Sequence, residues 1–369
     1  MTEIVAEIAN SHQGSPKKAE KLALKSLDVG ADAVKFQIYF ADELLVKNHP
    51  RYLHFKQQSF SERDWSKIIT KVKKKGKVYC DIFGLKAFNL AKKLKVDGYK
   101  IHSSDLLNFF LLKKVSKENK KIFLSSGGST IGEIKYALNF FKNSKSKPIL
   151  LHGFQSYPTK IEDIKLKRIS FLKKYFKNHA DVGYQDHTAG DDPFNLYLPL
   201  IAIGMGASII EKHVTLNRKK KGTDYYSSIE PKDLKKFIEI IKKCNLSFGE
   251  DVFSFSKLEN KYRAEVKKHW VSNKNLIKKN TIKKNVIMKR IHSTESEPLY
   301  YDDIEGCEIE KNISKDDIIN FNNIKKKNIA IIVARSNSKR LKKKAYLKIN
   351  GETLLDHLIK RTKLSKKID

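Results

Sequence analysis

The sequence predicts an α/β fold, a (β/α)8 (TIM) barrel, in residues 1–255. Strand-like and helix-like segments alternate eight times over about 250 residues, which is the size of one such barrel. Nearly every strand-like run also ends on an ionisable or hydroxyl side chain. Because parallel barrels carry their active sites at the carboxyl ends of the strands, this pattern predicts a functional site at that rim.

We expect each of the eight strands to be followed by a helix. The strands are expected at 4–8, 33–37, 77–82, 98–101, 121–124, 148–151, 180–183 and 207–210. Ser15-Pro16 is typical of a helix start, and Ser61 with Asp64 resembles a capping box with Asp in place of Glu. The interval 38–60 is expected to be a long loop.

The polar residues at the strand ends form the candidate site. They are Glu7, Lys35, Asp81, Lys100 with Ser103 and Asp105, Ser125, His152, His187, and Glu211 with His213. His187 and His213 follow neighbouring strands, so two neutral imidazoles could share one divalent ion. Each histidine could equally be a satisfied rim residue, so the hypothesis depends on the pattern across all the strands.

Composition narrows the class of protein. The chain has 369 residues, of which 40% are hydrophobic, enough for a real core. No run reaches the roughly 18 apolar residues of a membrane helix, and the first residues predict a strand rather than a signal segment. Cys80, Cys244 and Cys307 are too few and too scattered for a disulfide framework or a zinc site. We therefore expect a cytoplasmic protein with no membrane partner.

The net charge of +34 raises nucleic acid as a partner. The excess is nearly all lysine, spread over every predicted helix, with few arginines and no recognisable nucleic-acid motif. We therefore disfavour nucleic acid as the partner.

Two further parts follow the barrel. Residues 256–327 contain strands too short for βα units and predict a small β-rich domain. Residues 328–369 start another pattern, a buried strand at 329–334, a basic loop and a helix at 353–363, which would suit nucleotide phosphates. This last part is too short for a complete α/β domain.

Several motifs resemble the sialic acid synthase (N-acetylneuraminate synthase) family, over roughly the first 325 positions. They are AEIANSHQG at 6–14, GADAVKFQ at 30–37, YKIHSSD at 99–105, HGFQSYPT at 152–159, DHTAG at 186–190, EKHVTL at 211–216, GTD at 222–224 and SIEP at 228–231. Each motif alone is weak, but their order and spacing together make the resemblance specific.

The resemblance implies an activity and an assembly. The family condenses phosphoenolpyruvate with an N-acetylmannosamine-type or related N-acetylated hexose, giving a nonulosonic acid and phosphate. It implies that residues 256–327 are an antifreeze-like (SAF) domain whose Arg290 reaches the sugar's N-acetyl group in the partner subunit. The expected assembly is therefore a domain-swapped homodimer.

The resemblance also implies roles for individual residues. His187 and His213 would bind a divalent ion, Mn²⁺ or Mg²⁺. Glu7, Asp105 and Asp224 would be the catalytic carboxylates. The substrate-binding residues would be Lys35, Lys100, Ser103, Ser125, Gln155, Tyr157 and Arg290.

Some positions depart from the family pattern. Asp81 stands where a threonine is common beside phosphoenolpyruvate, and a carboxylate there should repel that substrate unless it is turned away. The other departures are Gly153 for cysteine, Gln155 for asparagine, Gln185 for serine and Ile291 for proline.

The last part resembles the start of a cytidylyltransferase. Its matching residues are Arg335, Ser338, Lys339, Arg340 and Gly351. Because forty-odd residues cannot complete that fold, we expect a truncated fusion with little activity of its own.

Two other classes of function stay open. One is a metal-dependent aldolase or epimerase on the same barrel, since a fold does not fix a reaction. The other is a binding protein, for carbohydrate through the small domain or for nucleic acid through its lysines. Release of phosphate from phosphoenolpyruvate would distinguish the condensing enzyme from both of these classes.

Overall fold

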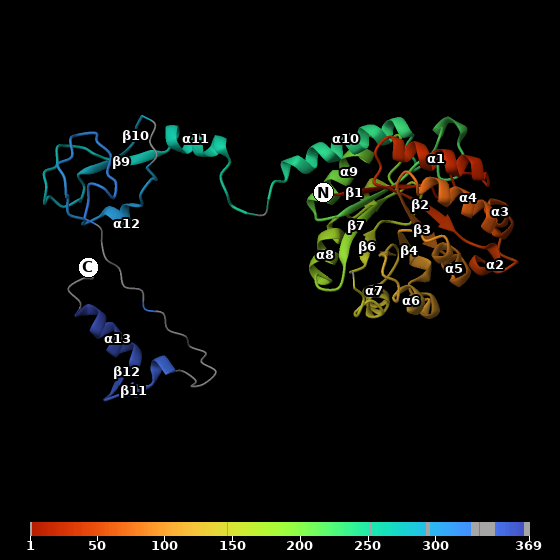
Figure 1. Cartoon of the computed structure of the whole chain (residues 1–369), viewed down its shortest axis with the longest axis horizontal. Helices are drawn as coiled ribbons and strands as arrows, with labels where there is room; N and C mark the ends of the chain where they lie inside the picture. The colour runs from red at the N-terminus through yellow and green to blue at the C-terminus, as the bar shows by residue number, and fades with distance from the viewer. Residues whose placement is uncertain are drawn as a thin grey trace. The chain divides into compact units, whose positions relative to one another are not determined.

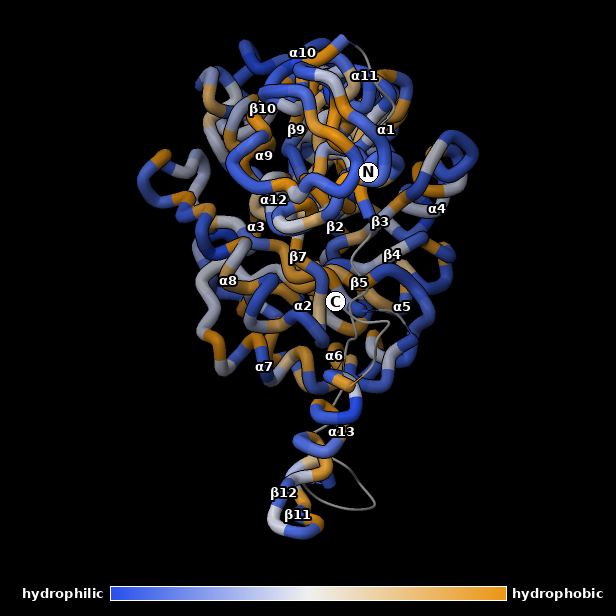
Figure 2. Tube along the Cα trace, turned by 90° about the vertical axis from the view of Figure 1, so that its left-hand side faces the viewer, coloured by the Kyte–Doolittle hydropathy of each residue, from blue (hydrophilic) through white to orange (hydrophobic). Residues whose placement is uncertain are grey.

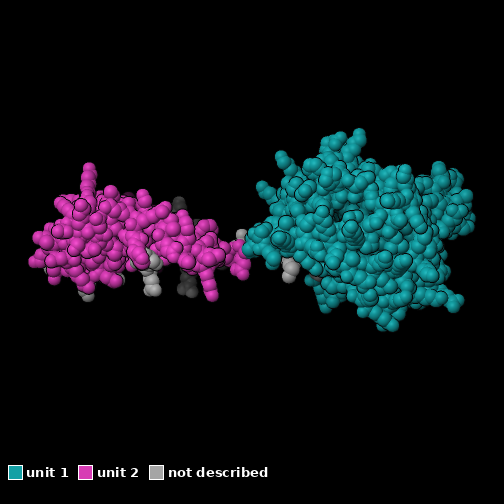
Figure 3. Space-filling view, turned by 90° about the horizontal axis from the view of Figure 1, so that it is seen from above, with its two compact units in different colours: residues 1–249 teal, residues 250–369 magenta. Residues whose placement is uncertain are grey.

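The computed structural model describes residues 2–145, 147–250, 252–292, 296–325, 332 and 344–364. The chain divides into two compact units, Met1–Gly249 and Glu250–Asp369 (Figure 3). Each unit is described by itself below. The finer division at 255 and 327 stays a prediction.

The first unit is a closed barrel of eight parallel strands in sequential order, β1 to β8, with β8 pairing back to β1 (Figure 1). The strands are β1 Glu3–Glu7, β2 Ala33–Ile38, β3 Lys77–Ile82, β4 Gly98–Ile101, β5 Lys121–Ser125, β6 Ile149–His152, β7 Asp181–Asp186 and β8 Ile209–His213. The helices that follow them are α1 Pro16–Asp28, α4 Glu62–Val72, α5 Leu85–Lys93, α6 Phe109–Val115, α7 Ile131–Asn139, α8 Lys167–Tyr175, α9 Phe194–Gly204 and α10 Pro231–Ser247. The predicted (β/α)8 barrel is confirmed.

The predicted helix starts are also confirmed. The Ser15 side chain accepts a hydrogen bond from the Lys18 backbone N–H, with Pro16 in the first turn of α1. The Ser61 hydroxyl likewise accepts from the Asp64 backbone N–H at the start of α4. These caps pair backbone donors that a helix start leaves without internal partners.

The expectation of a long loop at 38–60 is wrong. This interval contains α2 Ala41–Leu44 and α3 Tyr52–Gln58. The Tyr39 ring packs edge-on against Phe55 and Phe83, with centroids 5.2 and 6.2 Å apart. Aromatic packing therefore orders a segment whose sequence has no clear helical periodicity.

The barrel interior changes from apolar to charged along the strands. Val5, Ala33, Tyr79, Phe123, Ile149, Leu151 and Ile209 form one buried cluster. Alternate strand residues point to the same face, so the inward residues two positions later include Glu7, Lys35, Asp81, Ser125 and Glu211. The apolar layer thus forms a floor beneath a polar layer at the carboxyl ends of the strands.

The outward strand residues pack against the helices in the main core of the unit. Most barrel helices mix hydrophobic and hydrophilic residues along their length, as α7 does in Figure 2, whereas α9 is apolar nearly throughout. Each helix therefore buries one face on the barrel and leaves the other in water.

The second unit contains α11 Lys257–Val266, the antiparallel pair β9 Lys268–Ser272 and β10 Val286–Arg290, and α12 Tyr301–Ile304. Its small core consists of Leu276, Ile282, Ile304, Cys307, Ile309, Ile313, Ile319 and Ile324. The identification of this part as an antifreeze-like domain stays a prediction.

The last described segment is β11 Lys348–Ile349, β12 Glu352–Thr353 and α13 Leu354–Lys363. The helix predicted at 353–363 is present, with Thr353 as its N-cap. Gly351 lies in the turn between β11 and β12 with a φ of 84°. The other expected nucleotide-loop residues, Arg335, Ser338, Lys339 and Arg340, lie outside the described residues.

Within the described ranges, no helix is long and apolar enough to cross a membrane.

Candidate active site at the barrel rim

Two lysines and three carboxylates form a buried ionic cluster in the polar layer. Lys35 Nζ is ion-paired with Glu7 and lies 3.3 Å from Asp81 Oδ2 and 3.4 Å from Glu211 Oε2. Lys100 Nζ lies 2.7 Å from Glu211 Oε1 and 3.6 Å from Asp81 Oδ2. All five side chains are at most 4% exposed. Buried charges of this kind persist only when they are paired.

The carboxylates in this cluster differ in their affinity for protons. Burial raises the pKa of Glu7 to about 7, against the opposing effect of Lys35, and the charge of Glu211 adds to the rise. Burial acts in the same sense on Glu211, but Lys100 and Lys35 hold its pKa down at about 2. Glu7 is therefore the cluster's candidate for proton transfer near neutral pH.

Ser125 at the end of β5 is held by two amides. Its Oγ accepts from Gln185 Nε2 at 2.9 Å and from Gln155 Nε2 at 3.2 Å. Because a hydroxyl carries one hydrogen of its own, Ser125 keeps a donor for a ligand. Gln155 in turn accepts from the Tyr157 hydroxyl at 2.7 Å.

His187 and His213 lie together beside the cluster, with ring centroids 5.2 Å apart. The Tyr157 ring lies 4.4 Å from the His187 ring and 5.9 Å from the His213 ring. Burial lowers the pKa of His187 to about 4, and burial followed by the charge of His187 lowers the pKa of His213. Both rings are therefore neutral at physiological pH, which is the form that binds metal ions.

The two histidines fit a divalent ion. His187 Nδ1 is 2.7 Å from the Phe154 carbonyl oxygen, which fixes it as the protonated nitrogen and leaves Nε2 as an acceptor. His213 Nδ1 is buried with no hydrogen-bond partner among the described residues. No group of three His, Cys, Asp or Glu side chains in the described part of the chain converges as a metal site. The remaining ligands of an ion here would therefore be water or substrate oxygens.

The loop that follows β8 brings Asp224 to the rim. Asp224 Oδ2 accepts a hydrogen bond from the Asn10 backbone N–H at 3.0 Å. The Asp224 backbone has a left-handed φ of 63°. Burial raises the pKa of the Asp224 carboxyl group, against that hydrogen bond. Asn10 also accepts from the Tyr39 hydroxyl at 2.7 Å, so the loops after β1, β2 and β8 are tied together.

The structure gathers most of the predicted site residues. The contacts above join Glu7, Lys35, Lys100, Ser125, Gln155, Tyr157, His187 and His213 at one rim. Ser103 and Asp105 lie in a short helical turn after β4, where Asp105 accepts from Asn108 Nδ2 at 2.8 Å. Arg290 ends β10 in the second unit, where it is exposed. The catalytic role of Asp105 and the sugar-binding role of Arg290 stay predictions.

Three residues have more contacts in the site than the sequence indicated. Asp81 is not turned away, because it faces both lysines. Glu211 bridges the same two lysines, and Gln185 holds Ser125. Their positions at or near strand ends were the available signal, but which side chains they would contact could not be read from the sequence.

A second buried ion pair lies behind the rim. Lys212 Nζ lies 2.5 Å from Asp186 Oδ2, and Asp186 Oδ1 accepts from the Thr188 backbone N–H and from the Tyr184 hydroxyl. This pair holds the backbone on both sides of His187, so it positions that histidine without lining the rim.

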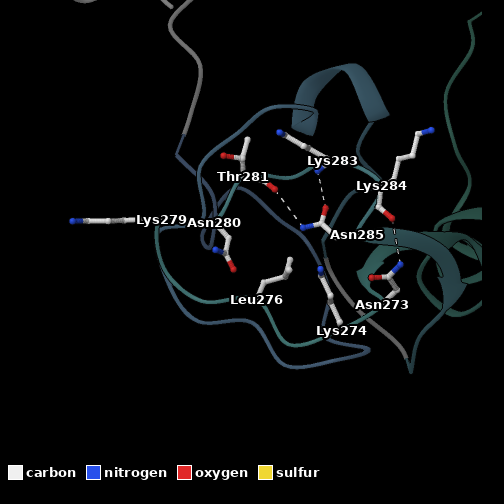
Figure 4. Close-up of a pocket in the computed structure, with 9 residues that line it drawn as sticks. All are labelled: Asn273, Lys274, Leu276, Lys279, Asn280, Thr281, Lys283, Lys284 and Asn285. Atoms are coloured by element: carbon white, nitrogen blue, oxygen red, sulfur yellow. Dashed lines mark hydrogen bonds between the residues drawn. The ribbon is translucent and has the colours of Figure 1, made fainter.

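The second unit has a hollow of different character. Figure 4 shows its lining side chains: Asn273, Lys274, Leu276, Lys279, Asn280, Thr281, Lys283, Lys284 and Asn285. In this view Lys279, Lys283 and Lys284 point away from one another, so their charges do not converge on one ligand position. The hollow is therefore a weaker candidate than the rim.

A (β/α)8 barrel with buried lysines, carboxylates and neutral histidines at its carboxyl rim is the arrangement of an enzyme that acts on anionic substrates. The chain belongs to the NeuB family, whose family model matches residues 23–253. A cytidylyltransferase family model matches residues 329–369. The resemblance to the sialic acid synthase family and the resemblance of the last part are both confirmed.

The chain is similar to several relatives, one of them a solved structure, over most of its length. It is 30% identical to the N,N'-diacetyllegionaminic acid synthase of Campylobacter jejuni, over 86% of this chain and 98% of that protein. It is 31% identical to an uncharacterized protein of Methanocaldococcus jannaschii, over 88% and 94%. The solved N-acetylneuraminic acid synthetase of Leptospira borgpetersenii, a complex with citrate, is 30% identical with a TM-score of 0.66, over 72% and 92%.

The pKa of Glu7 predicts how its replacement changes stability with pH. The pKa rises from an ordinary 4.5 to about 7 on folding, so the protonated form stabilises the fold fully below 4.5. That contribution, on the order of 1–3 kcal/mol, is lost as the pH rises through about 7. We expect Glu7→Gln to flatten the pH dependence of urea unfolding across this window, measured with a chelator present. An unchanged slope in the variant would contradict the shifted pKa.

Proposed function

We propose that this protein condenses phosphoenolpyruvate with the open-chain form of an N-acetylated hexose. The observation that carries the proposal is the placement of two buried lysines near two buried neutral histidines, close enough for their charges to act on the rings, at one barrel rim. Membership of the NeuB family supports it, as do relatives that are named as synthases of diacetyllegionaminic, pseudaminic and N-acetylneuraminic acids.

The proposed reaction joins the two substrates through one new carbon–carbon bond. C3 of phosphoenolpyruvate bonds to the aldehyde carbon of the sugar, and the aldehyde oxygen takes a proton to become a hydroxyl group. Water adds at C2 of the phosphoenolpyruvate portion. Loss of phosphate from C2 then leaves a 2-keto acid, so the sum is phosphoenolpyruvate, sugar and water giving nonulosonic acid and phosphate.

In this proposal the lysines bind the anionic donor. Lys35 on β2 and Lys100 on β4 lie on either side of β3 and would each contact phosphate or carboxylate oxygens with charge-assisted hydrogen bonds. Ser125 would add its free hydroxyl hydrogen, positioned by Gln155 and Gln185. Ser103, in the turn after β4, would extend this donor site.

His187 and His213 would hold a divalent ion, Mn²⁺ or Mg²⁺. Such an ion, when bound, would supply Lewis-acid polarisation of the sugar aldehyde. The Phe154 carbonyl orients His187 for this role, and Tyr157 covers both rings.

The proton transfers would be made by Glu7 and Asp224. The pKa of Glu7 is raised to about 7, so this carboxyl group can carry a proton near neutral pH, and burial raises the pKa of Asp224 in the same sense. One would protonate the aldehyde oxygen, and the other would take a proton from the attacking water. Asp105 would contribute a further carboxylate from the rim loop. Tyr157 and Gln155 would contact the sugar.

An assay of phosphate release tests the proposal. Phosphate should appear only when phosphoenolpyruvate, a divalent ion and an N-acetylated hexose are all present, and a panel of mono- and di-N-acetylated hexoses identifies the acceptor. His187→Ala and addition of a chelator should each lower the rate by roughly a hundredfold or more. Formation of a 2-keto acid without phosphate release would favour an aldolase instead, and a chelator-insensitive rate would refute the metal role.

We further propose that Arg290 acts in the barrel of a partner subunit, within a domain-swapped homodimer. A domain as small as the one predicted at 256–327 has a thin core and gains stability from another surface. Arg290 is exposed at the end of β10 and has no ion pair among the described residues, so in this proposal its charge is available to a substrate.

Mixed dimers test this assembly. Arg290→Ala and His187→Ala should each be nearly inactive alone, whereas a co-expressed mixture should recover part of the wild-type rate, because one site of the mixed dimer is intact. Arg263→Ala is the matched control, because it removes another arginine of the second unit, one that is ion-paired with Glu297. Heterodimers that form without any recovery would refute the exchange of Arg290.

A further inference from the structure

Asp81 occupies the space between the two lysines of the rim. Its Oδ2 lies 3.3 Å from Lys35 Nζ and 3.6 Å from Lys100 Nζ, and the side chain is fully buried. It comes from β3, which lies between β2 and β4, the strands that carry Lys35 and Lys100. A ligand that binds both ammonium groups must therefore also meet this carboxylate.

The second oxygen of Asp81 has no hydrogen-bond partner in the described part of the chain. Oδ1 is buried and forms no hydrogen bond within the described residues. An ionised carboxylate only accepts hydrogen bonds, so the missing partner has to be a donor. A fully ionised phosphate group carries acceptors alone and cannot supply it.

The charges around Asp81 show why its carboxylate opposes an anionic donor. The titratable groups that face it are Lys35 on β2, Lys100 on β4, Glu7 on β1, His102 after β4 and Tyr157 after β6. Glu211 on β8 shares both lysines with it. With Glu7 ionised, three carboxylates oppose two ammonium groups. The two lysines are thus already neutralised before an anionic donor binds, and Asp81 supplies the carboxylate that makes the net charge of the cluster negative.

We propose that Asp81 determines the charge state of the donor that binds at this rim. It disfavours phosphoenolpyruvate with a fully ionised phosphate and favours the form that keeps one phosphate proton, whose O–H donates to Oδ1. This inference rests on the proposed function only in taking phosphoenolpyruvate as the donor.

The test compares donor binding by the wild-type protein and by Asp81→Asn. Calorimetry with phosphoenolpyruvate itself measures the dissociation constant without turnover, at one fixed concentration of Mn²⁺. Phosphate monoesters lose their second proton near about pH 6, so the two proteins are compared at about pH 8 and about pH 6. We expect Asp81→Asn to bind at least about tenfold more tightly than wild type at the higher pH, with the ratio shrinking at the lower pH.

Two further variants keep the result interpretable. Asp28→Asn removes the same charge from an exposed ion pair with Lys75 at the end of α1, remote from the rim, and should leave the affinity unchanged. Asp81→Ser removes the carboxylate with a smaller side chain and should reproduce the gain if Asp81→Asn fails to fold.

Equal or weaker binding by both Asp81 variants at the higher pH would overturn the inference, as would a gain that does not shrink at the lower pH. Absence of any binding of phosphoenolpyruvate would overturn it as well. If the expected ratio is found but neither protein releases phosphate, the proposed function fails and the role of Asp81 stands.

Discussion

The buried pairing of Lys35 and Lys100 with three carboxylates is the interaction on which the rim of this barrel depends. Five strand ends, those of β1, β2, β3, β4 and β8, each contribute one charged side chain to it. Removing either lysine would leave carboxylates unpaired in the interior, which costs several kcal/mol, on the order of 3–5. The apolar floor of Tyr79 and Phe123 excludes water beneath the cluster and makes that pairing compulsory.

The same burial divides the site into regions of different proton affinity. It holds both histidines neutral, raises the pKa of Glu7 towards 7 and is overcome at Glu211 by the two lysines. Two neutral imidazoles, a carboxyl group with a pKa near 7 and a carboxylate that stays ionised therefore lie at one barrel rim. An anionic donor that enters it has to exchange partners with carboxylates that are already present.

The sequence was sufficient to predict the barrel and much of the rim, because the alternation of side chains along each strand links the two. Once the strands were placed, alternation alone put Glu7, Lys35 and Ser125 above the apolar residues two positions earlier. It could not show that Asp81 faces the lysines, because that depends on the register between β2, β3 and β4. It also missed α2 and α3, which are ordered by aromatic contacts between distant residues rather than by their own pattern.

A crystal structure with phosphoenolpyruvate and Mn²⁺ bound would test the central claim most directly. The account predicts anomalous density for the ion between His187 and His213, and a phosphate group within hydrogen-bonding distance of Lys35 and Lys100. The Asp81 carboxylate should then contact a phosphate oxygen. Phosphate bound elsewhere, with the ion pairs of both lysines to Glu7, Asp81 and Glu211 intact, would contradict the account.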